Sequence, residues 1–495
     1  MHAFFLSVGI LLLVSSLIGC RAFSPEPVRS NSSSEGTLFV GSDFLPQGVA
    51  VGDISSQSAL LWLRTDGPAS VQIEWATVSR WERASRLATV VAPVSRTVSI
   101  TTTAETDYTL TIPLEGLSPA TRYRYHVLVG FADQATKQLP ASASLAAKGE
   151  FTTLPDEKTS AAVIFAWSGD LGGQGRCRQG VGGYPIFDLI LQRNPDFFLL
   201  LGDTIYGDHV CPSPPNELGA DFKATTVQTY RVRHRYQRGA EALQQFLKTV
   251  PVYVIWDDHE VKNNFAGPFE EQMPAGRQAF REYWPIASPV DDPHRLYRRV
   301  RYGADLELFI LDTRQYRSRN ADPDGPAKTM LGSAQLAWLL DGLRRSTATW
   351  KVIVTSVPLS IPKGGDATVP GNDGWAGGPD GTGFEHERQV IVDAILQDTI
   401  KNVVFIGGDV HWVQANAYDP NQDGIIDFHE YVAGPLSASP GRFAPTRQEL
   451  HPTQLFHEAG YHNFGLVRVT KDTFDVTVVD ETGHRRASHV VPARP

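Results

Sequence analysis

From Ala161 onward, six short apolar runs alternate with helical stretches, and five of the six end in a polar side chain. This alternation is typical of an α/β domain, in which helices connect buried strands. The run Phe197–Leu201 stops at Gly202 and is too short for a helix, so we expect a strand buried on both faces. Open α/β sheets bind ligands at the carboxyl ends of their strands, so polar residues there are candidate site residues. The six runs end at Asp170, Asp203, Glu260, Arg314, Pro358 and His411.

Four of these ends carry groups that can bind a metal. They are Asp170, Asp203 with Tyr206, Asp258 with His259, and Asp409 with His411. Each carboxylate alone could be a helix cap or part of a surface salt bridge. Four in one predicted sheet favour a shared site, because two cations bridged by a carboxylate form a recurrent hydrolytic centre.

The order of these motifs resembles the calcineurin-like metallophosphoesterases, whose pattern is D-x-H, G-D-x-x-[DY], G-N-H-[DE] and G-H-x-H on successive strand ends. The chain is most similar to the PhoD-type alkaline phosphatases and phosphodiesterases. The segments that carry this resemblance are Trp256–Val261 with Asn263 and Asn264, Leu311–Arg314, Gly48–Asp53 and Leu61–Arg64. It implies a metallophosphoesterase β-sandwich flanked by helices, a four-layer αββα fold, preceded by an all-β domain of the immunoglobulin or fibronectin type III kind.

The resemblance also implies roles for individual residues. Asp203 would bridge two cations, with Asp170, Tyr206 and His411 completing one site and Asp258, Asn263 and Asp409 the other. His259 is expected to transfer a proton or contact phosphate. Arg314 has the geometry to clamp phosphate oxygens, and its alternative is a structural salt bridge with Asp312 or a neighbour.

The chain departs from the superfamily pattern at three places. Gly172 and Asp409 stand where histidines are expected, and the strand Lys351–Pro358 lacks its usual histidine. The resulting oxygen donors suit Fe(III), Ca(II) or Mn(II) better than a zinc pair. The resemblance implies iron with calcium in a dinuclear or trinuclear centre, with manganese or zinc as alternatives.

A second cation site is predicted by a stretch that matches the calcium-loop pattern D-x-[DN]-x-[DN]-G-x5-E. Its donors are Asp419, Asn421, Asp423, Asp427 and Glu430. The flanks do not read as paired helices, because Tyr431–Pro435 looks extended. The alternative is an acidic turn whose side chains satisfy backbone donors.

Residues 37–155 read as an all-β domain, and residues 161–495 as the metallophosphatase domain. Short strand candidates separated by turn residues fill the first segment, and Leu117–Tyr123 resembles a tyrosine corner. A glycine-rich stretch over 364–383 is a candidate lid or substrate rim, with a disordered insertion as the alternative.

The first 19 residues read as a signal peptide with the apolar core Ala3–Ile18. Leu17–Cys20 resembles a lipobox, which predicts lipidation of Cys20 and a flexible tether over 20–36; an ordinary cleaved signal is the alternative. Cys177 and Cys211 are then the remaining cysteines. We expect them to form a disulfide in an oxidising compartment, with metal ligation by one of them as the alternative.

The net charge of −9, without a basic stripe, argues against a nucleic-acid groove. Together with the resemblance, the acidic strand ends and the N-terminal segment imply a monomeric exported phosphoesterase of the cell envelope or periplasm, anchored by lipid, that hydrolyses phosphomonoesters, phosphodiesters or both through a metal-bound hydroxide. One alternative is an enzyme similar to purple acid phosphatases. Another is a surface binding lipoprotein with an inactive hydrolase domain.

Overall fold

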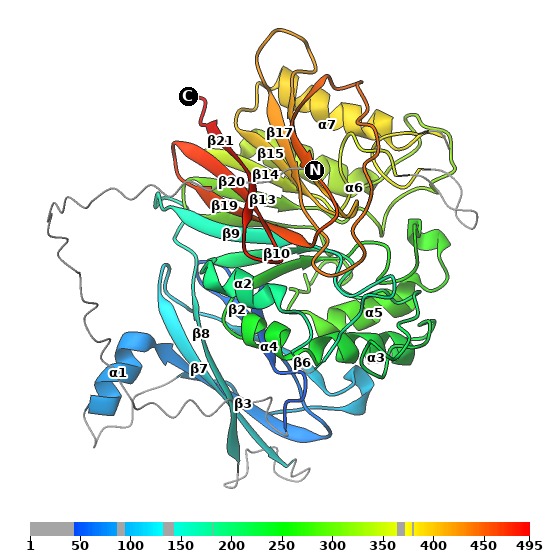
Figure 1. The fold of residues 1–495 in the computed structure, drawn as a ribbon. Helices are drawn as coiled ribbons and strands as arrows, with labels where there is room; N and C mark the ends of the chain where they lie inside the picture. The colour runs from blue at the N-terminus through cyan, green and yellow to red at the C-terminus, as the bar shows by residue number, and fades with distance from the viewer. Residues whose placement is uncertain (1–43, 87–94, 132–142, 181, 364–371, 379–380) are drawn as a thin grey trace, which may run out of the picture. The chain divides into compact units, whose positions relative to one another are not determined.

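Two β-sheets that pack face to face and carry helices on their outer faces form the core of the protein in the computed structural model (Figure 1). The structure describes residues 44–86, 95–131, 143–180, 182–363, 372–378 and 381–495. The predicted signal peptide, the tether over 20–36 and Cys20 lie outside these residues. Within the described ranges, no helix is long and apolar enough to cross a membrane.

The first sheet has nine strands, and its central strands are parallel. In spatial order they are β21 (Arg485–Pro492), β20 (Thr473–Asp480), β19 (Asn463–Val469), β9 (Val163–Ser168), β10 (Phe197–Leu201), β11 (Val252–Ile255), β1 (Val49–Gly52), β2 (Ala59–Arg64) and β6 (Thr109–Leu114). The second sheet has seven: β12 (Arg298–Tyr302), β13 (Leu306–Ile310), β14 (Trp350–Val354), β15 (Val403–Gly407), β17 (Phe428–Val432), β16 (Val413–Tyr418) and β18 (Pro452–Glu458).

Alternation along the buried strands builds the layers. In β10, Phe197, Leu199 and Leu201 face the second sheet, whereas Phe198 and Leu200 face outward. The outward residues pack under α2 (Ile186–Gln192), α4 (Glu241–Leu247) and α5 (Met273–Tyr283), and α3 (Val227–Arg238) lies against α5. On the second sheet, outward residues pack under α6 (Gly332–Arg345) and α7 (Glu385–Gln397). The predicted four-layer αββα fold is confirmed.

The N-terminal segment is β-rich but does not form a sandwich separate from the rest of the chain. Its strands β1, β2 and β6 extend the nine-stranded sheet, because β1 pairs in parallel with β11. The other strands make a five-stranded sheet: β4 (Ser95–Arg96), β3 (Ala69–Thr77), β7 (Arg122–Phe131), β8 (Ser144–Thr152) and β5 (Ile100–Thr101) on β3. The segment also includes α1 (Val78–Arg86) and the short 3-10 helix η1 (Ala104–Thr106). Strands from both sides of the expected domain boundary at 155–161 therefore belong to the same sheet. Residues 40–495 form one compact unit.

The predicted tyrosine corner is present at the start of β7. The backbone N–H of Ser118 donates a hydrogen bond to the Tyr123 hydroxyl at 2.9 Å. Contacts also join the N-terminal segment to the helices of the main domain: the indole N–H of Trp62 donates to the Glu282 carbonyl at 2.7 Å. The Arg238 guanidinium lies over the Trp62 ring at 3.9 Å.

Candidate metal centre

The carboxylates singled out in the sequence meet where strand ends from the two sheets converge. Asp170 follows β9, Asp203 follows β10, Asp258 follows β11 and Asp409 follows β15. Each of these four residues is at most 3% exposed. The strand order of the sheets thus brings together residues that are up to 239 positions apart, because the carboxyl ends of parallel strands lie at one edge.

One group of potential ligands consists of Asp170, Asp203 and His411, whose donor atoms all lie within 4.8 Å of one another. The Tyr206 hydroxyl is 3.0 Å from His411 Nε2, which is also 3.4 Å from Asp170 Oδ1. His411 Nδ1 lies 2.6 Å from the Ser439 carbonyl, to which it donates as Nδ1–H. That bond leaves Nε2 with its lone pair directed at the carboxylates, as a metal-binding histidine requires.

A second group lies directly beside the first. Asp258 and Asp409, with Asp257, place their oxygens within 4.8 Å of one another, and so do Asp203, Asp258 and His259. Asp203 therefore belongs to a group on either side of it. A carboxylate shared in this way is what a bridging ligand between two cations requires.

Carboxylate oxygens without a hydrogen-bond partner indicate whether this arrangement could hold cations. Asp170 Oδ2, Asp258 Oδ1 and Asp409 Oδ2 are buried and have no hydrogen-bond partner among the described residues. Burial, followed by the charges of Asp258 and Asp257, raises the pKa of Asp203, and burial likewise raises the pKa of Asp409. Buried carboxylates without partners cost free energy unless they are paired or coordinate metals, so the residues fit a cation centre.

The backbone at these strand ends is held in an uncommon conformation. The left-handed φ angles are 63° at Asp170, 49° at Asp203, 71° at Asp409 and 63° at His411. Such angles in residues other than glycine cost free energy and cluster at functional sites. The buried Glu260 carboxylate supports two of the strand ends, because it accepts backbone N–H bonds from Thr204 at 2.6 Å and from Asp257 at 2.9 Å.

Gly172 shows why the chain lacks the first expected histidine. Its φ is +72°, and a Cβ atom there would lie 2.3 Å from the Tyr184 hydroxyl and 2.4 Å from Gln237 Nε2. No side chain fits at this position without movement of these two residues. Tyr206 and His411 provide the non-carboxylate donors on this side of the centre instead.

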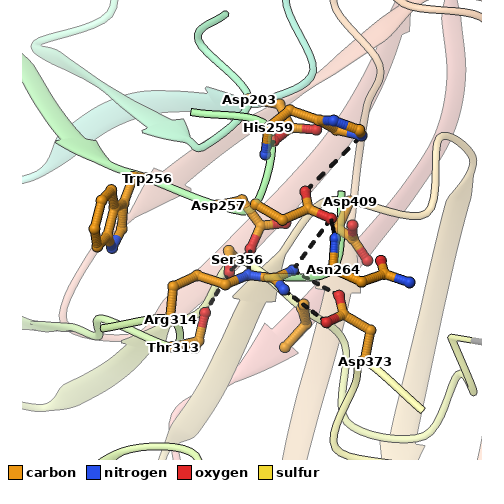
Figure 2. Close-up of polar contacts among 12 residues, drawn as sticks. Asp203, Trp256, Asp257, His259, Asn264, Thr313, Arg314, Ser356, Asp373 and Asp409 are labelled. Carbon is orange, nitrogen blue, oxygen red and sulfur yellow. Dashed lines mark hydrogen bonds and ion pairs between the residues drawn. The ribbon is translucent and has the colours of Figure 1, made fainter. Parts of the chain in front are cut away.

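The asparagine predicted as a ligand differs from the one that the structure places in the site. Asn263 is only half-buried, and its backbone N–H donates to Asp208 Oδ2 at 2.9 Å. Asn264 is 4% exposed, its N–H donates to Asp258 Oδ2 at 2.7 Å, and its side chain lies beside Asp409 (Figure 2). Asn264 is therefore the better candidate ligand. The two are neighbours in sequence, and only the left-handed turn at Asn264, with a φ of 56°, separates their orientations.

His259 lies between the metal-binding carboxylates and Asp208, which the sequence did not single out. His259 Nδ1 is 2.7 Å from Asp208 Oδ1, and its Nε2 is 4.0 Å from Asp258 Oδ1. Burial lowers the pKa of His259, but the charges of Asp258 and Asp208 outweigh burial and raise it to about 9. The ring also stacks on Tyr206 with centroids 4.3 Å apart. These contacts hold His259 at the edge of the centre, where a proton donor is useful.

Arg314 does not clamp phosphate, contrary to the expectation. Its side chain is fully buried, and Nη1 and Nη2 each lie 2.7 Å from an oxygen of Asp373 (Figure 2). Its Nε donates to Asp257 Oδ1 at 2.6 Å. Arg314 therefore forms a structural salt bridge, as in the alternative, but not with Asp312. Its main partner is Asp373, which lies 59 residues further along the chain and binds both terminal nitrogens of the guanidinium.

Lys363 is a further residue that the sequence did not single out. Its Nζ lies 2.8 Å from Asp409 Oδ1. Burial lowers the pKa of Lys363, but the charge of Asp409 and then that of Asp258 outweigh this and raise it above its ordinary value. A lysine in a loop carries no motif, so no sequence signal could have placed it here.

Cys177 and Cys211 form a disulfide, with Cα atoms 6.0 Å apart. The structure thus agrees with the predicted pairing, in which neither sulfur is left to ligate a metal. The bridge ties the loop after β9 to the loop after β10, next to the Tyr206 side of the centre.

Carboxylates of the predicted calcium loop accept hydrogen bonds from the loop's own backbone, as the alternative of an acidic turn expects. Asp419 accepts the backbone N–H groups of Asp423 at 3.1 Å and Gly424 at 2.9 Å, and Asp423 accepts that of Ile425 at 2.8 Å. Glu430, the expected twelfth-position ligand, lies instead in β17 and is buried. Its carboxylate accepts from the Leu359 N–H at 2.6 Å and from the Tyr418 hydroxyl. Assigning Glu430 to the calcium loop was wrong, because the strand turns its side chain into the core.

The described part of the glycine-rich stretch is not a free lid. Trp375 is 1% exposed and packs with α6 and α7, and Asp373 is held by Arg314. Residues 364–371 and 379–380 lie outside the described residues.

Comparisons with known proteins agree with this geometry. The PhoD-like phosphatase family matches residues 165–478, and the PhoD-like phosphatase N-terminal domain matches residues 32–155. Alkaline phosphatase D of Bacillus subtilis (strain 168) is 28% identical over 472 residues, which covers 86% of this chain and 75% of that protein.

Two solved structures share the fold. The structure of PhoD superposes with a TM-score of 0.70 at 23% identity and covers 91% of this chain and 89% of its own. Purple acid phosphatase PPD1 from yellow lupin seeds superposes with a TM-score of 0.61 at 13% identity, with coverages of 90% and 73%. The alternative of an inactive domain is disfavoured, because the family match coincides with a buried carboxylate cluster that retains unpaired oxygens. The chain therefore belongs to the PhoD-like phosphatase family, whose members are metal-dependent phosphoesterases.

Proposed function

We propose that this phosphatase acts outside the cytoplasm on phosphomonoesters, phosphodiesters or both, with iron and calcium in its centre. The observation that carries the proposal is the position of Asp203, whose carboxylate belongs to two adjoining ligand groups. Direct hydrolysis by activated water suits this site better than a covalent mechanism, because the sequence contains no serine or cysteine in a recognisable nucleophile turn.

The donor sets favour different metals on the two sides. Asp170, Tyr206 and His411 would join Asp203 around Fe(III), for which phenolate, carboxylate and imidazole are suitable donors. Asp258, Asp409 and the Asn264 amide would join Asp203 around Ca(II), which prefers oxygen donors. Manganese and zinc are the alternatives, and elemental analysis of the purified protein distinguishes them from iron and calcium. When bound, such cations act as Lewis acids that activate water and stabilise charge on the phosphoryl group.

His259 is the side chain best positioned for proton transfer. Its Nδ1–H donates to Asp208, so the ring keeps one orientation with Nε2 facing the centre. When the ring is protonated, Nε2 can donate to a phosphoryl oxygen or to the departing alkoxide.

Export is supported by two independent features. A disulfide persists in oxidising compartments and is rare in the cytosol. The Leu17–Cys20 segment, which resembles a lipobox, supports attachment to the membrane through Cys20. We also propose that the enzyme is a monomer and, given its net charge of −9, that it does not bind nucleic acid as a structural partner.

Asp203→Asn tests the centre. We expect purified Asp203→Asn protein to lose bound metal, and its kcat/KM on mono- and diesters to fall at least about 100-fold. Asp196→Asn is a matched control, because Asp196 is exposed and precedes the other end of β10. Elemental analysis and paired ester assays give the answer. Full turnover by folded Asp203→Asn protein contradicts the proposed centre.

The metal and the location have their own tests. Iron on Tyr206 predicts a visible charge-transfer absorption that disappears in Tyr206→Phe, and a colourless iron-loaded protein overturns this assignment. For location, fractionation of cells that express the full chain should recover it with membranes, and Cys20→Ser should release it. Recovery in the cytosol contradicts export.

A further inference from the structure

The burial of Arg314 removes the cation that was expected to bind phosphate. Its three nitrogens are occupied by Asp373 and Asp257, and the side chain is 0% exposed. A phosphate ester that enters the centre lies close to the buried carboxylates as well as to the proposed cations, so a basic side chain beside them can add to its binding. A basic side chain other than Arg314 can supply this positive charge.

Lys363 is placed for this role. It lies nine residues beyond the end of β14, in the loop that follows this strand, and contacts Asp409, which follows the neighbouring strand β15. Its Nζ donates to Asp409 Oδ1 at 2.8 Å and to the Asp409 carbonyl at 3.4 Å. An ammonium has three N–H groups, so these two bonds leave one for a further acceptor.

The side chain of Lys363 is more exposed than the carboxylate that it contacts. The Lys363 side chain is 27% exposed, against 3% for its partner Asp409. The Lys363 side chain thus reaches solvent with part of its length, while its ammonium contacts a buried carboxylate of the centre. Asp409 anchors it through one oxygen, and its other oxygen, Oδ2, has no partner among the described residues and can face a cation.

We propose that Lys363 donates its remaining N–H to a non-bridging oxygen of the substrate and thereby favours phosphomonoesters over phosphodiesters. The inference rests on the proposed function and narrows its substrate class. A monoester loses its second proton with a pKa near 6, so at alkaline pH it carries about two negative charges, whereas a diester carries one. A fixed ammonium binds the more charged ester more strongly.

The experiment compares charge-removing and charge-keeping variants of the full chain. Lys363→Met and Lys363→Gln remove the charge in two ways, so that one remains usable if the other folds poorly, and Lys363→Arg keeps it. Lys351→Met is the matched control: Lys351 lies in β14, and its Nζ donates to the Lys401 carbonyl at 3.3 Å. Each protein is assayed with 4-nitrophenyl phosphate and bis(4-nitrophenyl) phosphate. Calorimetric titration with inorganic phosphate and elemental analysis complete the set.

The expected result is selective. In Lys363→Met and Lys363→Gln, kcat/KM for the monoester falls about 10- to 100-fold and phosphate affinity falls by a similar factor, while kcat/KM for the diester changes less than about threefold. Lys363→Arg retains most of the monoester activity, and Lys351→Met matches the parent. Metal content stays the same in all of them.

Other outcomes overturn the inference. Equal losses on both esters with unchanged phosphate affinity mean that Lys363 only positions Asp409. Loss of metal in proportion to activity means that it maintains a ligand. Unchanged kinetics show that it does not contact substrate. If the metal-loaded parent hydrolyses neither ester, the proposed function fails by itself, and the phosphate titration still decides the role of Lys363, because unchanged affinity in Lys363→Met contradicts it.

Discussion

The metal centre and the turn over Asp419–Glu430 are both rich in acidic side chains, yet the structure treats them differently. In the centre, Asp170, Asp258 and Asp409 are buried, and within the described part of the chain each keeps one oxygen without a partner. In the turn, Asp419 and Asp423 are exposed and their oxygens accept backbone N–H groups, whereas Asp427 Oδ2 is buried and has no partner among the described residues. The comparison teaches that clusters of similar acidic composition can differ in how far their oxygens are already satisfied: three ligand candidates of the centre keep an unpaired oxygen, whereas most oxygens of the turn that are described accept backbone N–H groups.

The largest effect is expected in the metal centre. The same substitution, aspartate to asparagine, is made in each region to compare them. Asp409→Asn removes a ligand, and we expect kcat/KM to fall about 1000-fold or more with loss of metal, since even outer partners of metal ligands cost 10- to 100-fold. Asp419→Asn should keep full activity and metal content. Steady-state kinetics and elemental analysis measure both. Equal losses in the two variants would remove the distinction between the regions.

Arg314→Met tests a third way in which this protein accommodates acidic side chains: buried carboxylates paired with a guanidinium. The substitution leaves Asp373 and Asp257 buried without their partner, so the free energy of unfolding should fall by about 3–5 kcal/mol. Arg344→Met is the control, because Arg344 and Asp398 form an exposed pair with side chains 50% and 37% accessible, and we expect a loss of about 0–1 kcal/mol there. Urea unfolding measures both, and similar costs would contradict the argument.

His234 is a buried polar group outside the metal centre. Burial, and then the charges of Arg238 and Arg233, lower its pKa to about 3, against 6.5 in the unfolded chain. Between these values the unfolded state binds a proton that the folded state does not, so stability falls as pH decreases below 6.5, by about 2 kcal/mol at pH 5. Above pH 7.5 the group has no effect. His234→Phe should remove this part of the pH dependence in urea unfolding, and identical pH profiles would contradict it.

The smallest effects are expected in the acidic turn. Asp423→Ala should change the free energy of unfolding by about 0.5 kcal/mol or less, as exposed substitutions do. Glu430→Gln should cost about 1 kcal/mol, because Glu430 accepts three buried hydrogen bonds from Leu359, Asn416 and Tyr418. Added calcium should raise Tm equally in the parent and in Asp423→Ala. A calcium-dependent shift that Asp423→Ala abolishes would restore the turn as a calcium site.

Much of the centre could be predicted because its residues follow a local rule. Asp170, Asp203, Asp258 and Asp409 each come directly after an apolar run, and the carboxyl ends of parallel strands meet at one edge. The disulfide followed from counting the cysteines that remain after an export signal. Asp208, Lys363 and the partner of Arg314 could not be predicted in the same way, because each depends on contacts between loops distant in sequence.

The sequence by itself determined the alternation of buried strands and helices and the identity of the acidic strand ends, because periodicity and strand termination are properties of neighbouring residues. Only the tertiary structure decided which carboxylate oxygens stay unpaired, that Arg314 faces Asp373, and that Glu430 points into the core. The reason is physical: solvation and hydrogen bonding depend on which groups surround a side chain in three dimensions, and most groups around this centre come from the loops of two different sheets.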